Sequence, residues 1–297
     1  MTNEHDWARR FHLPDAGVRG VIVRLSDSWA EIAARADYPA PVRDALGQYV
    51  LAAALFAADL RFAGSVSVQW RGEAALSLLF AECSNQGRLR GLAQWQGPID
   101  TALTPRSLGQ SGALAITIER SRDEPRYQGL VPLEGDSFER AFEGYFLRSE
   151  QLPTALRMVV DGGRLSGMLV QQVPSEGGHA IRGETLEFER VAALFRTLTA
   201  PELAGLPVET LLRRLFAEDD VQLQPAVPLS FGCSCSRERV EAMLRSLGEV
   251  EVYAARTDGG QVEVKCEFCN QRYDFDLGDI ASLFAPAGAE AGPRSLH

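Results

Sequence analysis

The spacing of apolar residues over the first part of the chain predicts several strands with few helices between them. Short runs of β-branched and other apolar residues alternate with turn residues, which is typical of consecutive strands. These runs cover residues 18–25, 65–70, 75–80, 88–95, 113–118, 126–131, 155–161 and 165–173. Consecutive short strands favour an antiparallel or mixed sheet, so residues 1–180 are predicted to form one α+β domain.

Three helices are predicted within this domain. Asp27 and Ser28 are candidate caps for a short first helix. Pro41 occupies a favoured first-turn position of a second helix, and apolar residues recur at helical spacing from there to Leu60. Residues 137–149 have the same periodicity. We expect these helices to cover the predicted sheet with their apolar faces.

Beyond residue 180 the pattern changes from strands to helices. Residues 184–198 and 207–216 are amphipathic, with apolar residues along one face of each helix. The loop at residues 174–178 separates this region from the α+β domain. Two interpretations remain open: an ordinary helical subdomain, or a helical linker over residues 181–230 whose apolar faces are buried only under some conditions.

Residues 231–297 are predicted to form a small separate module. Ser236 can cap a helix over residues 237–247, and Gly248 can end it. The other predicted elements are two strands around the hairpin signal Asp258-Gly259-Gly260, a returning strand and a last helix, at residues 249–255, 261–266, 272–275 and 280–284. A module of this size has too small a core to fold securely, so it is expected to need a metal or disulfides.

The cysteines of this module carry the most specific chemistry in the sequence. Four of the chain's five cysteines form two pairs, Cys233-Ser-Cys235 and Cys266-Glu-Phe-Cys269, with residues 236–265 between them. Four thiolates can close a tetrahedral Zn²⁺ site that has no open position, or the pairs can form two local disulfides. The C-x-C spacing is unusual for structural zinc, and a disulfide across it would be strained and easily reduced. The pattern predicts either a structural zinc site or a reversible redox switch.

The other polar residues of the chain indicate less about its function than the four paired cysteines do. Four basic residues next to the two motifs are expected to offset the charge of a four-thiolate site: Arg237, Arg239, Lys265 and Arg272. Cys83 stands alone and is expected to be a buried, inert thiol. The histidines form no cluster, and we find no nucleotide-binding loop or nucleophile elbow. The protein is therefore predicted not to be an enzyme, with an enzyme carrying a structural zinc as an alternative.

The charge of the chain argues against nucleic acid as a partner. The 297 residues have a formal net charge of -10, and an acidic chain binds polyphosphates poorly. A zinc-ribbon nucleic-acid-binding protein is therefore the weaker alternative. No apolar run approaches the roughly 18 residues that a membrane span needs, and the N-terminus has no signal-peptide pattern. We expect a cytoplasmic protein without a membrane partner, and a reducing cytosol disfavours permanent disulfides.

The motifs of the C-terminal module resemble the redox-switch domain of the bacterial heat-shock protein thirty-three family, which are redox-regulated holdase chaperones. The matching stretches are Cys233-Ser-Cys235-Ser-Arg-Glu-Arg, Cys266-Glu-Phe-Cys269-Asn, Tyr273-Asp-Phe275-Asp and Asp279-Ile280. Weaker matches at Val18-Arg-Gly, at Tyr38-Pro and over residues 129–133 extend the resemblance to essentially the whole chain.

The resemblance implies a function and a mechanism. Reduced Cys233, Cys235, Cys266 and Cys269 would bind one Zn²⁺ in an inactive chaperone. Oxidation would form the disulfides Cys233–Cys235 and Cys266–Cys269 and release the zinc. The module and the adjacent linker would then lose structure and expose apolar surface. The active form, commonly a homodimer, would hold unfolding client proteins without ATP.

Overall fold

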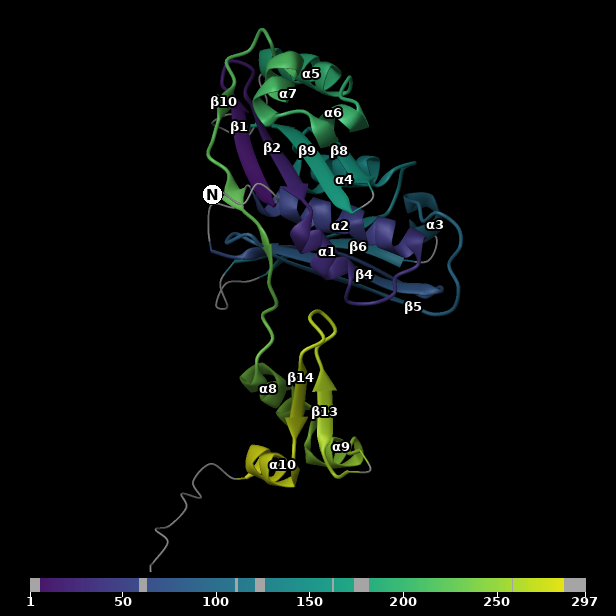
Figure 1. The fold of residues 1–297 in the computed structure, drawn as a ribbon. Coiled ribbons are helices and arrows are strands. Elements are labelled where there is room, and N and C mark those ends of the chain that lie inside the picture. Colours follow the sequence, from purple (N-terminus) through teal and green to yellow (C-terminus); the bar gives the residue numbers. More distant parts are fainter. Residues whose placement is uncertain are drawn as a thin grey trace, which may run out of the picture. The chain divides into compact units, whose positions relative to one another are not determined.

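The computed structural model describes residues 6–58, 63–109, 112–120, 126–161, 163–173, 182–257 and 259–285. The chain forms two compact units, Met1–Gly232 and Cys233–His297, which we describe one at a time (Figure 1). Within the described ranges, every helix is too short or too polar to span a lipid bilayer.

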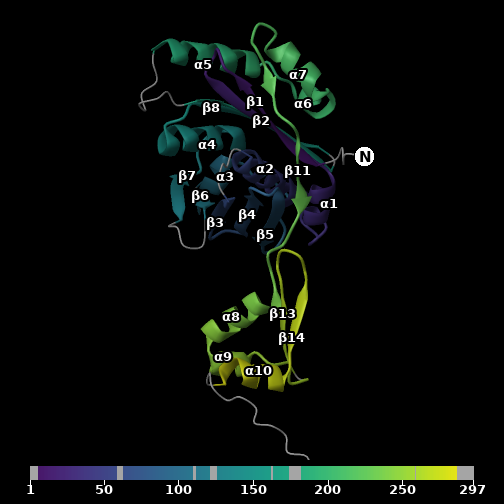
Figure 2. The same ribbon diagram turned by 90° about the vertical axis from the view of Figure 1, so that its left-hand side faces the viewer.

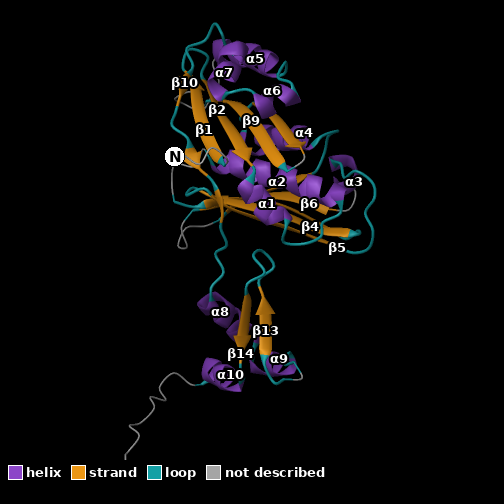
Figure 3. Cartoon of the chain, in the orientation of Figure 1, coloured by secondary structure: helices purple, strands orange, loops and turns teal. Residues whose placement is uncertain are grey.

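The first unit contains two sheets, which we name sheet A and sheet B (Figure 3). Sheet A consists of β1 (Trp7–Leu13), β2 (Val18–Leu25), β8 (Thr154–Asp161), β9 (Arg164–Gln172), β10 (Gln222–Leu223) and β11 (Val227–Pro228). Sheet B consists of β3 (Ser65–Gly72), β4 (Leu76–Ser84), β5 (Arg88–Trp95), β6 (Gly112–Glu119), β7 (Tyr127–Pro132) and β12 (Ser230–Phe231). The order in sheet A is β10-β1-β2-β9-β8, with β11 also paired to β1, and the order in sheet B is β12-β5-β4-β3-β6-β7.

Helix α2 (Ala40–Ala57) lies between the two sheets and forms the centre of the main core. The sequence predicts one core-facing stripe on this helix, but most of its 18 residues are buried. The reason is that α2 packs against sheet A on one side and sheet B on the other, and a helix enclosed in this way is apolar all round. Pro41 lies in its first turn, as predicted, whereas Leu60 lies outside the described residues.

Sheet A is buried on both faces. Val21 and Val23 of β2 belong to the core around α2, whereas Ile22 between them belongs to a second core on the opposite face. That second core is covered by a helical layer, formed by α5 (Arg182–Phe195), α6 (Ala200–Gly205) and α7 (Val208–Leu215) (Figure 2). In this structure the apolar faces of the helical layer are therefore buried on sheet A.

Three shorter helices complete the first unit: α1 (Asp27–Ala33), α3 (Pro105–Gly109) and α4 (Phe138–Tyr145), which continues as one π-turn over Phe146–Glu150. The predicted caps of α1 are wrong, because neither Asp27 nor Ser28 caps it. Instead the carboxylate of Asp6 accepts hydrogen bonds from the backbone N–H groups of Ser26, Asp27 and Ser28. A residue far away in the sequence thus caps this helix.

The predicted strands and helices of the first unit are all present, with bounds that differ by a few residues. Helices α3 and α6 and strands β1, β10, β11 and β12 were not predicted. Arg9 and Arg10 interrupt the apolar pattern of β1, and α6 is too short to show a period. The loop at residues 174–178 lies outside the described residues.

The second unit contains α8 (Arg237–Leu247), α9 (Glu249–Ala254), the hairpin β13 (Val262–Lys265) and β14 (Arg272–Phe275), and α10 (Leu277–Phe284). Ser236 caps α8 through the N–H of Arg239, and Gly248 ends it with φ 93°, as predicted. The described part of this unit has a core of only six buried apolar residues: Val240, Leu244, Val252, Val262, Phe275 and Ile280.

The predicted hairpin around Asp258 is wrong. Residues 249–254 form helix α9, and the hairpin closes instead through the turn that carries the second cysteine pair. The alternation of Glu and Val here resembles a half-buried strand, but Val252 is buried while Val250 is 80% exposed. Glu249 and Glu251 in the first turn favour the helix, because they face the positive end of its dipole. Asp258 itself lies outside the described residues.

Candidate metal centre

The fold of the second unit brings its four cysteines together. Cys233 and Cys235 lie in the segment just before α8, and Cys266 and Cys269 lie in the turn between β13 and β14. Their Sγ atoms all lie within 4.8 Å of one another. The two motifs are distant in the sequence, so the helix and the hairpin must both be folded for the cluster to exist.

The backbone of each motif orients its sulfur atoms. The N–H of Cys266 donates to the carbonyl of Gln271 (2.9 Å), and the N–H of Asn270 donates to the carbonyl of Cys266 (2.8 Å). Asn270 has φ 61°, a left-handed conformation that asparagine tolerates better than most residues. In the first motif the N–H of Cys235 donates to Sγ of Cys233 (3.5 Å). The second pair is thus held in a tight turn, and the first pair lies in an irregular segment just before α8.

The sulfur geometry fits a tetrahedral metal site. Sγ of Cys233 lies 3.6 Å from Sγ of Cys266, and Sγ of Cys235 lies 3.3 Å from Sγ of Cys269. Four Zn–S bonds of about 2.3 Å in a regular tetrahedron place neighbouring sulfurs about 3.8 Å apart. The four thiols therefore already have nearly the separation that a Zn²⁺ ion of coordination number four requires, and all of them come from this one unit.

The same distances bear on the disulfide alternative. All five cysteines are free, and a disulfide would need sulfurs about 2.05 Å apart. The two short contacts join one motif to the other, whereas the predicted disulfides lie within each motif. Forming the predicted pairs would thus require the cluster to rearrange, and the pairing itself stays a prediction.

The environments of the four thiols are unequal. Burial raises the pKa of Cys235, but hydrogen bonds from the Tyr273 hydroxyl (3.2 Å) and from neighbouring thiols outweigh it, and the pKa is lowered to about 7. Burial and hydrogen bonds with neighbouring thiols raise the pKa of Cys269 to about 12. Cys235 thus deprotonates more readily than Cys269, and a bound cation would favour the thiolate form of all four cysteines.

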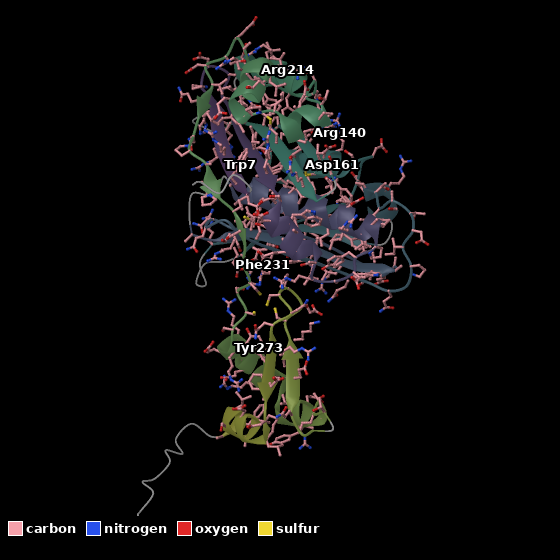
Figure 4. All side chains as sticks on the ribbon, in the orientation of Figure 1. Trp7, Arg140, Asp161, Arg214, Phe231 and Tyr273 are labelled. Atoms are coloured by element: carbon pink, nitrogen blue, oxygen red, sulfur yellow. The ribbon has the colours of Figure 1, made fainter. Side chains whose placement is uncertain are left out.

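Two side chains near the cluster make contacts that the sequence did not predict, although Arg239 is one of the basic residues expected near it. Tyr273 lies on β14, and Figure 4 labels its side chain. Arg239 donates to the carbonyl of Ser234, between the first two cysteines (2.7 Å). Tyr273 lies two positions before buried Phe275 on β14, so the period of the strand places both side chains on the same face of the hairpin. The period indicates that Tyr273 points inward, but it does not indicate which cysteine the hydroxyl contacts.

Two of the basic residues expected near the cluster support the frame of the module. The guanidinium of Arg237 pairs with Asp279 (2.8 Å) and lies over the ring of Phe275. Arg272 pairs across the hairpin with Glu263 (3.1 Å). Their charges are thus partly balanced by carboxylates of the same unit.

The remaining cysteine has a different environment. Cys83 lies on β4 in the first unit and is 1% exposed. Burial raises its pKa to about 12, so it is protonated at neutral pH, as expected for an inert thiol.

The fold and the cluster define a class: an α+β protein whose small C-terminal unit carries a cluster of four cysteines that could hold a metal ion. The model of the Hsp33 protein family matches residues 6–276. The 33 kDa chaperonin of Ectopseudomonas mendocina is 43% identical over 295 residues, covering 99% of this chain and 100% of the relative. The 33 kDa chaperonin of Chromobacterium violaceum is 43% identical over 296 residues, covering 99% of each chain. The chain therefore belongs to the Hsp33 protein family.

A solved structure supports the fold independently. The crystal structure of the 33 kDa chaperonin from Thermotoga maritima matches with a TM-score of 0.77 at 21% identity, covering 94% of this chain and 98% of the other. The α+β class predicted from the sequence is confirmed.

Proposed function

We propose that this protein is a redox-regulated, ATP-independent holdase chaperone that is inactive while one Zn²⁺ is bound by Cys233, Cys235, Cys266 and Cys269. The observation that carries the proposal is the closed cluster of four sulfurs in a unit with so small a core. Relatives over nearly the full length of the chain bear the name 33 kDa chaperonin, which agrees with a chaperone function.

The metal is expected to decide whether the second unit folds. Structural zinc contributes about 10–16 kcal/mol of apparent binding free energy in small peptides, whereas the described residues of this unit bury only six apolar side chains. The cysteines also join the helix α8 segment to the hairpin, so losing the metal removes the link between these elements. We infer that the unit unfolds when its metal leaves.

Oxidation supplies the trigger. Two molecules of peroxide accept four electrons from the four thiolates, and with four protons they yield four waters and two disulfides. The expected pairs are Cys233–Cys235 and Cys266–Cys269. Sulfurs bound in disulfides are no longer thiolate ligands, so the zinc is released. The process is reversible, because dithiol reductants restore the four thiols.

The helical layer is the proposed source of client-binding surface. Its apolar faces and the face of sheet A beneath them form a continuous buried cluster that includes Phe11, Ile22 and Met168 of the sheet. Loss of structure in residues 181–230 would expose both sides of that cluster. Unfolding client proteins expose apolar segments of their own, so they would bind to this exposed surface. The active form would be a homodimer, and the protein would act in the cytoplasm.

The test measures zinc content, free thiols and suppression of client aggregation before and after treatment with peroxide at raised temperature. We expect holdase activity to appear together with zinc release and two disulfides per chain. Peptide mapping decides whether the disulfides lie within the motifs or across them. Cys83→Ala serves as the matched control, because it removes a cysteine outside the cluster. A protein that loses zinc and gains no activity would refute the proposal.

A further inference from the structure

The segment that leads into the metal-binding unit covers one edge of each sheet. Residues 222–232, which we name the strap, pair first with β1 through β10 and β11 and then with β5 through β12. Without the strap, β1 would be the edge strand of sheet A and β5 the edge strand of sheet B. Figure 2 shows the strap in light green, with β11 beside β1.

Backbone hydrogen bonds hold the strap along its length. The N–H of Gln224 donates to the carbonyl of Arg10 (2.8 Å), and the N–H of Leu229 donates to the carbonyl of Asp6 (3.0 Å), both in the region of sheet A. Two further backbone bonds of 2.9 Å join the strap to sheet B: Ser230 N–H to the Gly87 carbonyl, and Gly232 N–H to the Leu89 carbonyl.

The strap also occupies a fitted site for side chains. Leu229 is buried in the main core, and the guanidinium of Arg35 lies 4.6 Å from the ring centre of Phe231 (Phe231 in Figure 4). Gly87 has φ +75°, and a Cβ at this position would lie 2.3 Å from the carbonyl oxygen of Pro228. The edge of β5 thus accepts an extended chain with apolar side chains two positions apart.

The opposite edge of sheet A is concealed in another way. The carboxylates of Glu143 and Glu139 on α4 accept hydrogen bonds from the N–H groups of Leu156 (2.9 Å) and Met158 (2.8 Å) on β8. This edge is closed by side chains of a helix that belongs to the main core, whereas β1 and β5 are closed by the strap. Exposed strand edges readily pair with other chains, so the position of the strap determines whether β1 and β5 are available.

The strap is restrained at both ends by elements that the proposed mechanism releases. The helical layer ends just before it, and Gly232 directly precedes the metal ligand Cys233. Each of its pairings spans only two residues, and such short ladders are marginal unless their ends are fixed. Releasing both ends therefore favours detachment of the whole strap.

We propose that the strap is an internal substitute for client protein: its detachment on oxidation opens the edges of β1 and β5, which then pair with an extended, apolar segment of an unfolding polypeptide. This inference rests on the proposed function and specifies how clients are bound. The strap itself shows what the edges accept, namely an extended backbone with apolar residues at alternate positions, as at Leu229 and Phe231. Pairing with backbone groups also suits a protein that holds clients of many sequences.

The test uses the full-length oxidised protein and a fluorescent peptide with the sequence of residues 222–232. Two N-methylated variants of the peptide form a matched pair. The first is methylated at Ser230, whose N–H donates to the Gly87 carbonyl beside β5. The second is methylated at Phe231, whose N–H points away from β5 because successive N–H groups of a strand point to opposite sides. Anisotropy measures binding, and displacement of heat-unfolded citrate synthase measures competition. Hydrogen exchange of Ser230 and Gly232 in the full chain reports detachment of the strap.

We expect the unmodified and N-methyl-Phe231 peptides to bind oxidised protein and displace the client. The N-methyl-Ser230 peptide should bind about tenfold more weakly, because one hydrogen bond is lost. The reduced, zinc-loaded protein should bind none of them. If oxidised protein holds client but binds no peptide, or binds both N-methyl peptides equally, the inference is wrong while the proposed function stands. Dissociation of an oxidised dimer by the peptide without displacement of client would also overturn it, since the edges would then bind a second copy. If the oxidised protein does not hold client at all, the proposed function is refuted. Peptide binding would still show whether the edges of β1 and β5 accept an extended chain.

Discussion

The helical layer offers the most quantitative prediction, because its release can be promoted without touching the cysteines. Leu211 on α7 is 0% exposed and belongs to the cluster between the layer and sheet A. Leu211→Ala removes three buried carbon atoms and leaves a cavity, which costs about 2–5 kcal/mol. If this cost acts on the closed layer alone, the population of the open layer rises about 30- to 4,000-fold.

The matched control is the same substitution at an exposed position of the same layer. Leu186 on α5 is 62% exposed, so Leu186→Ala is expected to change stability by less than about 0.5 kcal/mol. Both variants keep the four cysteines and should bind one Zn²⁺ per chain. We therefore expect Leu211→Ala, and not Leu186→Ala, to suppress client aggregation partly in the reduced state.

Two measurements check this prediction. Hydrogen exchange should be faster in α7 and at its C-cap Phe216, whose N–H donates to the carbonyl of Leu212 in the unsubstituted protein. Aggregation of a heat-unfolded client, followed by light scattering under reducing conditions with zinc present, measures the activity. If Leu211→Ala opens the layer and yet gives no activity beyond that of Leu186→Ala, the layer does not conceal the client-binding surface.

Three further predictions concern single side chains. Tyr273→Phe removes the hydroxyl that donates a hydrogen bond to Sγ of Cys235 (3.2 Å). Zinc affinity, measured by competition with a chelator, should fall about tenfold. Unchanged zinc affinity would show that this hydrogen bond does not contribute to metal binding. Cys235→Ser should reduce zinc to well below one per chain and speed hydrogen exchange throughout the second unit, whereas Cys83→Ala should keep full zinc content. Asp6→Ala removes the side-chain cap of α1 and should lower the free energy of unfolding, measured by urea denaturation, by about 1–2 kcal/mol. The control is Asp15→Ala at an exposed position. Equal urea midpoints for the two variants would contradict the assigned cap.

Much of the fold could be predicted from local patterns in the sequence. Strand β2 was predicted with its observed bounds, because a continuous β-branched run is the pattern of a strand buried on both faces. Helix α8 was likewise predicted from its capping residue Ser236 and its terminal Gly248. In these elements the local preference and the tertiary environment agree.

The errors arose where distant residues decide the structure. Asp6 caps α1 from outside the helix, and no local pattern in residues 26–28 indicates this. Residues 249–254 alternate like a strand but fold as a helix, since Val252 and its neighbour Tyr253 pack on the small core while Val250 is exposed. The strands β10, β11 and β12 are two residues each, so they exist only because β1 and β5 provide partners.

The candidate site likewise has parts that local sequence predicts and parts that depend on tertiary contacts. The four cysteines could be predicted because their spacing is specific, and the structure brings their sulfur atoms together. The hydrogen bond from Tyr273 to Cys235 and the carbonyl contact of Arg239 could not be found, since both depend on how the hairpin meets the segment before α8.

The central claim is that one metal ion, held by four thiolates, keeps the chaperone inactive. The most direct measurement follows zinc content, free thiols and holdase activity in the same sample during oxidation by peroxide. We expect one zinc and five thiols at the start, then no zinc, one thiol and full activity, with the three changes in step. Activity that rises while zinc stays bound, or zinc that leaves with two disulfides formed and no activity gained, would contradict the account.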